Sequence, residues 1–186
     1  TVGDLIAAAK AKPGSLNFSS VGVGSATHLS AELFRQATEI KAVHVPFKGG
    51  SDAMTEVLAG RIDFFFGPVG LVHPAIEEAR KRALATNGPV RSSALPAVAT
   101  LQEGGISNAD YPIWFGLFVP AKTPEEVKDR LHGDTLRALQ APQVRAKLAA
   151  LGLDPLPMTR HEFTAHVKRE IERNAGLVRS VGLKAQ

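Results

Sequence analysis

Glycines and small hydroxyl-bearing residues gather in one short stretch of the chain. The stretch reads Asn17-Phe18-Ser19-Ser20-Val21-Gly22-Val23-Gly24-Ser25-Ala26-Thr27-His28-Leu29. An apolar strand followed by a glycine-broken loop and a first helical turn directs unpaired backbone N–H groups, hydroxyls and the positive helix end at one spot. Such a spot binds a small carboxylate or a phosphate. Since no catalytic group stands beside it in sequence, we predict capture of a small anion without chemistry on it.

Other interpretations of the same residues remain open. Gly22 and Gly24 are not a dinucleotide fingerprint, because Thr27 occupies the place of its third glycine, and no Gly-Lys-Ser/Thr follows as in a P-loop. A plain tight turn with a Ser cap is the alternative. His28 could donate to a bound carboxylate or cap the loop, and Lys48 could pair with a ligand or face solvent.

Metal sites and common catalytic sets have no support in the sequence. The histidines are scattered without H-E-x-x-H spacing, and cysteine is absent. There is no G-x-S-x-G elbow, and the adjacent Glu77 and Glu78 point different ways on a helix. We therefore expect no metal, no cofactor and no enzymatic activity.

The elements that must position these residues alternate between strand and helix. Predicted strands cover residues 16–20, 41–46, 62–66 and, weakly, 82–86, and predicted helices begin near residues 2, 26, 52 and 72. This alternation predicts a parallel α/β sheet, in which ligands bind at the carboxyl ends of the strands. The loops 20–27, 47–51 and 67–70 should converge there, which brings Gly49 and Gly67 to the same cleft.

The second part of the chain is predicted to be mostly helical. We expect a helical piece at 98–104, an extended segment at 114–120, and helices that open at Thr123-Pro124, Pro142 and the capping box Thr159–Glu162. Phe163, Val167, Ile171 and Val178 should form the buried stripe of the last helix.

Charge and composition exclude further classes. The excess of basic residues lies in 122–186, where charges alternate in sign along helices, a pattern typical of a solvated helix face. With one Tyr and one Trp there is no stacking platform for single strands, and we expect no nucleic-acid partner. The absence of cysteine fits an oxidising compartment, and no apolar run reaches the length of a membrane span.

At these residues the chain resembles the Bug family, the periplasmic solute-binding proteins of tripartite tricarboxylate transporters. The resemblance is carried by residues 18–29, Val43-His44-Val45-Pro46-Phe47-Lys48-Gly49-Gly50, Gly60-Arg61-Ile62-Asp63-Phe64, residues 82–85 and 91–96, and Trp114-Phe115-Gly116-Leu117-Phe118-Val119-Pro120-Ala121. It implies a type II periplasmic-binding-protein flytrap that closes on a carboxylate, a dicarboxylate or an aromatic acid, in the periplasm. Its partners would be membrane transporter subunits. The residues that match the family's ligand loops are Ser20, Gly24, Ser25, Ala26, Thr27, His28, Lys48 and Gly49.

The resemblance also implies a division of the chain. Residues 1–115 would be one complete parallel-sheet lobe, 116–121 a hinge crossing, and 122–186 the helical return part of the other lobe. The family's N-terminal portion, with the other jaw and the secretion signal, would be absent, which would expose the 163–171 stripe. Two alternatives to a solute receptor remain open from the sequence. The chain could be an effector-sensing domain of a regulator, or a truncated lobe that mainly self-associates. Many relatives have Asp after the third strand, and Gly67 stands there instead, which disfavours an amino-acid ligand.

Overall fold

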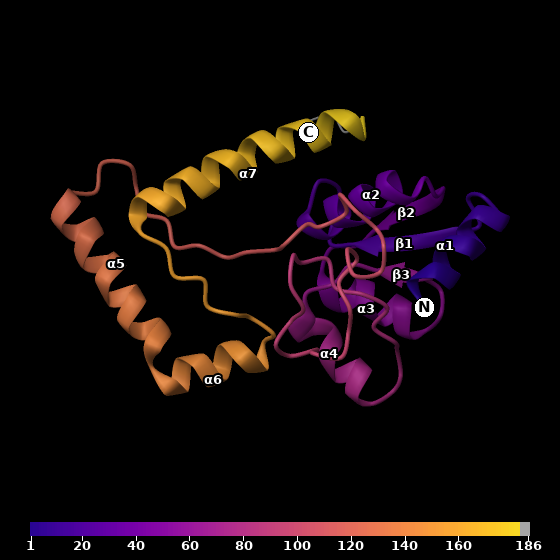
Figure 1. The fold of residues 1–186 in the computed structure, drawn as a ribbon, viewed down its shortest axis with the longest axis horizontal. Helices are drawn as coiled ribbons and strands as arrows, with labels where there is room; N and C mark the ends of the chain where they lie inside the picture. Colours follow the sequence, from indigo (N-terminus) through magenta and orange to yellow (C-terminus); the bar gives the residue numbers. More distant parts are fainter. Residues whose placement is uncertain (183–186) are drawn as a thin grey trace.

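An α/β body, residues 1–111, is followed by a helical arm, residues 112–182, in the computed structural model, which describes residues 1–182 (Figure 1). The elements of the body are α1 (Val2–Ala11), β1 (Leu16–Ser20), α2 (Ala26–Thr38), β2 (Ala42–Pro46), α3 (Gly50–Leu58), β3 (Phe64–Phe65) and α4 (Val69–Glu77). Those of the arm are α5 (Glu125–Gln140), α6 (Pro142–Ala150) and α7 (Arg160–Ser180).

The sheet is parallel, with the strand order β2-β1-β3. In the register of the central pair, Phe18 lies beside His44 and Ser20 beside Pro46. On the other side, β1 pairs Phe18 with Phe64. Because all three strands run the same way, their carboxyl ends and the loops that follow lie at one edge, as predicted.

Aromatic side chains build the core between the sheet and its helices. Phe18 and Phe34 are at most 1% exposed, and Phe64 stacks on Phe18 with ring centroids 5.5 Å apart. The capping boxes at Thr1–Asp4 and Thr159–Glu162 are both formed, as predicted. Helices α3 and α4 begin earlier than predicted, at Gly50 and Val69. The helix predicted with Thr123 as its N-cap is capped by Pro124 instead and begins at Glu125.

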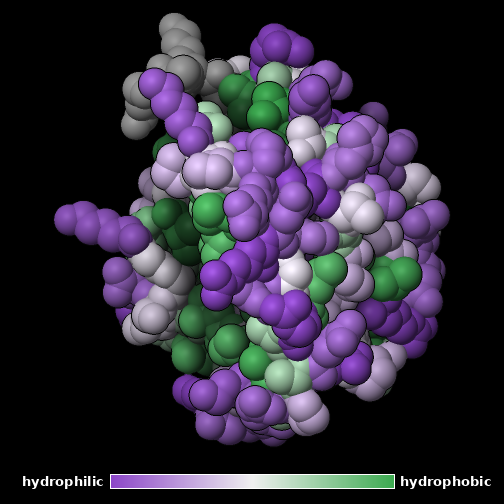
Figure 2. Space-filling model, turned by 90° about the vertical axis from the view of Figure 1, so that its left-hand side faces the viewer, coloured by the Kyte–Doolittle hydropathy of each residue, from purple (hydrophilic) through white to green (hydrophobic). Residues whose placement is uncertain are grey.

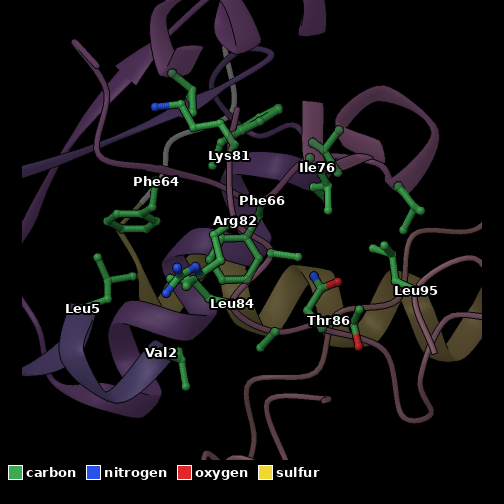
Figure 3. Close-up of a pocket in the computed structure, with 18 of the residues that line it drawn as sticks. Val2, Leu5, Phe64, Phe66, Ile76, Lys81, Arg82, Leu84, Thr86 and Leu95 are labelled. Atoms are coloured by element: carbon green, nitrogen blue, oxygen red, sulfur yellow. The ribbon is translucent and has the colours of Figure 1, made fainter. Parts of the chain in front are cut away.

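Two predicted strands are shorter or missing. The third strand forms over Phe64–Phe65 only, and residues 82–86 pair with no strand among residues 1–182. Thr86 instead bridges Thr100, donating its N–H to the carbonyl of Ala99. A cavity of about 210 Å³ separates this segment from β3, and Figure 3 shows Phe64, Phe66 and Leu84 around it. The prediction of a fourth strand was therefore wrong, because the backbone of 82–86 never reaches β3.

The prediction of a helix at 98–104 was also wrong. The segment turns at Leu101–Gly105, with the N–H of Gly104 on the carbonyl of Thr100. Gly105 then takes a left-handed conformation, φ 82°, which stops any helix from propagating.

The arm packs on the body through one end of α7 and through the end of α6, where Leu151 meets Gly70 of α4. Leu177 is buried against Leu29 and Tyr111, and the hydroxyl of Tyr111 donates to Asn174 at 2.9 Å. Helices α5 and α6 bury no residue. Ile171 is 63% exposed, and Phe163, Val167 and Val178 are only partly buried, so the prediction that these four form a buried stripe was wrong.

An apolar groove of about 620 Å³ lies on the arm between the extended segment before α5, α5 itself and α7. Figure 2 shows apolar side chains in a hollow on this end of the molecule, ringed by polar ones. The apolar residues that line the groove and are also exposed are Phe115, Leu117, Phe118, Val119, Leu131 and Leu156.

Candidate anion-binding site

The loop between β1 and α2 is held in one shape by two glycines. Gly22 has φ 124° and Gly24 φ 77°, conformations that residues with a Cβ rarely adopt. The N–H of Ser25 returns to the carbonyl of Gly22, and the N–H of Phe47 reaches the carbonyl of Ser20 at 2.9 Å. The loop is thus tied to itself and to the end of β2.

The hydroxyl groups of the loop are engaged inside it. The Oγ of Ser25 donates to the carbonyl of Gly22 at 2.7 Å and caps α2 by accepting from the N–H of His28. The Oγ1 of Thr27 accepts from the N–H of Val21 and lies 3.0 Å from Ser25 Oγ. These hydroxyls, predicted as ligand groups, therefore shape the loop.

Two backbone donors at the start of α2 are left for a ligand. Among the hydrogen bonds of residues 1–182, none uses the N–H of Ala26 or of Thr27. They are the first two N–H groups of a helix of 13 residues, where the helix dipole is positive. The arrangement can hold an oxyanion with backbone N–H groups alone.

The second predicted loop adds another helix start. Gly49 caps α3 in an extended conformation without any side-chain hydrogen bond, and Lys48 beside it is exposed. The Cα of Gly50 lies close to Val21 of the first loop and Leu71 of α4. Lys48 forms none of the ion pairs found among residues 1–182, so its charge is available.

The third predicted loop, residues 67–70, contacts other parts of the molecule than the first two loops do. Gly67 lies against Phe65 and Val72 and lines the cavity beside β3. Gly70, at the start of α4, touches the backbone of Leu151 at the end of α6. Leu71 of α4, which follows this loop, lies against Gly50 of the second loop.

His28 and His44 lie beneath the loop. His28 is 3% exposed, and its Nδ1 accepts from the N–H of Gly24 at 3.0 Å, which is the capping role left open by the sequence. Its ring stacks on that of His44 at 3.8 Å between centroids, and His44 Nε2 lies 2.6 Å from Ser20 Oγ. Burial, and next the nearby His28, lower the pKa of His44 to about 4.

Sequence reasoning missed His44. It sat among scattered histidines, and only the strand register, which sets it beside Phe18, brings it under the loop. Asp63 is a structural residue, since its carboxylate accepts from the N–H of Asn17 at 2.7 Å. Among residues 1–182, no group of three or more His, Asp or Glu side chains is placed to hold a metal ion.

Comparison with known proteins identifies this architecture. The model of the tripartite tricarboxylate transporter family receptor, TctC, matches residues 1–183. The chain belongs to the TctC family. It is 34% identical to the protein BugT of Bordetella pertussis over 182 residues, 97% of this chain and 55% of that protein. This membership confirms the resemblance found in the sequence.

Solved TctC-like structures share the fold. A structure of Rpa4515 from R. palustris with adipate superposes with a TM-score of 0.87 at 28% identity, covering 98% of this chain and 61% of the other. MatC from Rhodopseudomonas palustris with bound malate gives 0.77 at 26% identity, covering 95% and 61%. The chain thus has the α/β fold of these carboxylate-bound proteins, and it spans about half the length of most curated relatives it matches.

Proposed function

We propose that this TctC-family chain takes part in capturing a small carboxylate, a dicarboxylate or an aromatic acid, for a membrane transporter, without converting it. One observation carries the proposal: the first two N–H groups of α2 are unengaged, on a loop that is tied to the end of β2, from which Lys48 and the uncapped start of α3 follow. This combination suits a carboxylate, which accepts several hydrogen bonds and is attracted by positive helix ends.

The two carboxylate-bound relatives favour a dicarboxylate. Adipate and malate, the molecules in those structures, each carry two carboxyl groups. The loop of residues 20–28 would hold one of them, and the other would face away from this lobe. In this chain Gly67 offers no carboxylate to an amino group, which agrees with a ligand without one.

All predicted site residues but one then have a part in binding. Ala26 and Thr27 would contact the ligand through their N–H groups, with Lys48 and Gly49 at the neighbouring helix start. Gly67, which packs against Phe65 and Val72, would have no direct contact with the ligand and would only precede α4. The residues that would hold the loop in place are Ser20, Gly24, Ser25 and His28.

Location and partners follow from the same proposal. We place the chain in the periplasm, where a receptor of this family meets its transporter, and we divide it as predicted, into residues 1–115, 116–121 and 122–186. Positions 183–186 of the last part lie outside the described residues. None of the helices among residues 1–182 combines the length and apolar character needed to cross a bilayer.

The proposal is tested by titrating adipate, malate and benzoate into the chain by calorimetry, with thermal unfolding in parallel. A ligand at a hundred times its Kd should raise the unfolding free energy by about 2.7 kcal/mol. Gly24→Asp should abolish binding, because it adds a negative charge and a Cβ at φ 77°. The matched control is Gly60→Asp, with φ 74° and equally open surroundings at the opposite end of α3.

Absence of any response to all three acids would contradict the proposed capture. An equal response of the Gly24→Asp and Gly60→Asp variants would contradict the proposed site, since both changes strain the backbone alike.

A second function, self-association, is favoured by the exposed groove of the arm. Phe115 and Phe118 are 74% and 62% exposed, and burying such side chains between two copies would be favourable. Sedimentation at increasing concentration tests it: a constant monomer mass would rule it out, and a rising mass suppressed by Phe118→Ser would support it.

A further inference from the structure

Two stacked histidines support the anion-binding loop from below. The rings of His28 and His44 are nearly parallel, 12° apart, and the ring of Phe18 stacks on His44 with centroids 4.9 Å apart. His28 comes from α2 and His44 from β2, so the pair joins the helix that carries the site to the neighbouring strand.

The hydrogen bonds of His28 fix which nitrogen carries its proton. The N–H of Gly24 donates to Nδ1, so Nδ1 must present a lone pair. The proton of the neutral ring is then on Nε2, which faces Glu32 at 3.6 Å. A second proton on Nδ1 would point at the Gly24 N–H and break this bond.

His44 is restricted by charge rather than by the direction of a hydrogen bond. Its Nε2 lies 2.6 Å from Ser20 Oγ, which donates to the carbonyl of Gly22 at 3.0 Å and accepts from the N–H of the same residue. A protonated His44 places a cation directly on the ring of His28. Two charged imidazoles at this separation repel each other strongly.

Among residues 1–182, the charged groups found to act on the pair are Glu32 and Arg35, both on α2. Glu32 faces His28 and is paired with Arg35 at 2.5 Å, and Arg35 in turn lies over the ring of Phe18. The neighbours from β1, Phe18 and Ser20, are uncharged, and β2 contributes His44 itself. One carboxylate, already shared with an arginine, cannot compensate two imidazolium charges.

We propose that His28 and His44 are positioning residues that hold the anion-binding loop only while both rings are neutral, so that carboxylate binding weakens as the pH falls. The proposal rests on the proposed function of the loop. It makes the bond from Gly24 to His28 the point at which protonation acts on the site.

The direction of the pH effect follows from linkage. The pKa of His44 is lowered to about 4 by burial and by His28, from an ordinary 6.5. The held loop therefore binds fewer protons than an opened one between these values and loses its advantage as the pH falls through them. For one proton the loss is at most about tenfold per pH unit.

Calorimetric titration of adipate from pH 7.5 to pH 5 tests the proposal in the wild-type chain and two variants. In His28→Asn the amide oxygen can take the place of Nδ1 without titrating, and in His28→Leu the acceptor is lost. At pH 7.5 we expect the Asn variant to bind more tightly than the Leu variant, and the Leu variant to bind about tenfold more weakly than the wild type or worse.

Adipate itself takes up protons as the pH falls, and it does so equally in both experiments. Dividing the affinity of the wild type by that of His28→Asn therefore cancels this effect. That ratio should fall severalfold between pH 7.5 and pH 5. A flat ratio, or a Leu variant that binds like the wild type at pH 7.5, would overturn the proposal.

Nitrogen NMR of the unliganded chain tests the proposed role of the histidines even when no acid is bound. The ring of His28 should carry its proton on Nε2, and the Gly24 amide should lose protection from exchange on acidification. A proton found on Nδ1 at pH 7.5 would overturn the proposal. Absence of adipate binding at every pH would instead count against the proposed function, and the NMR result would stand apart from it.

Discussion

The body and the arm of the chain are stabilised in different ways. In the body, the aromatic core around Phe18 and Phe34 is sealed between sheet and helices. In the arm, α5 and α6 bury nothing, and Leu177 is the one residue beyond position 111 among the buried apolar residues of the described chain. The site lies on the body, where backbone positions are fixed by packing.

This difference explains why a loop on the body can hold its N–H groups in fixed positions. Loop 20–28 rests on a buried strand and on the buried rings of Phe18 and His28. Its N–H groups therefore have fixed directions. The arm is attached through the end of α7 and through contacts of α6 with α4. Its apolar groove is available for burial against another surface.

The largest expected effect comes from removing equal side chains in the two regions. Phe18→Ala should lower the free energy of unfolding by about 3–5 kcal/mol, because it empties a filled core. Phe118→Ala should change it by about 0.5 kcal/mol or less, since that ring is 62% exposed. Urea unfolding followed by circular dichroism measures both, and similar losses would show that the arm has a core of comparable weight.

A second prediction concerns the seam between the regions. A Cβ at Gly70 of α4 would lie 2.5 Å from the carbonyl oxygen of Leu151, so Gly70→Ala should cost about 1–3 kcal/mol as the end of α6 is displaced. The matched control is Gly133→Ala in α5, whose Cβ would meet only the tip of Arg137 at 3.6 Å.

The control should change stability in the opposite direction. Alanine is the better helix former, so Gly133→Ala should stabilise by about 0.5–1 kcal/mol. If both variants were stabilised, α6 would not rest on α4 in solution.

The sequence predicted well whatever depends on local chemistry. Capping boxes, the parallel strands β1 and β2, and the loop at Gly22 and Gly24 follow from short-range patterns. It failed where long-range pairing decides: residues 82–86 have strand-like composition but find no partner edge. The buried role of His28 and the contribution of His44 depend on strand register, which no local pattern contains.

The smallest expected effect lies within the arm, where ion pairs join helices that share little core. Arg160 of α7 contacts both Glu125 and Asp129 of α5, and bonds from Lys128 and then Arg160 lower the pKa of Glu125 to about 2. This tie is present above the ordinary titration range of Glu and is lost as the pH falls towards 2. Because these side chains are exposed, Arg160→Ala should lower the free energy of unfolding only slightly, and 1 M salt should abolish the difference.

Arg145 of α6, which takes part in none of the ion pairs found among residues 1–182, provides the control for that change. Arg145→Ala should leave urea unfolding unaltered in low and high salt alike. A salt-independent loss at Arg160 would mean that its aliphatic stem, packed along the groove that it lines, matters more than its charge. The arm would then depend on apolar contact after all, and its contrast with the body would be one of degree.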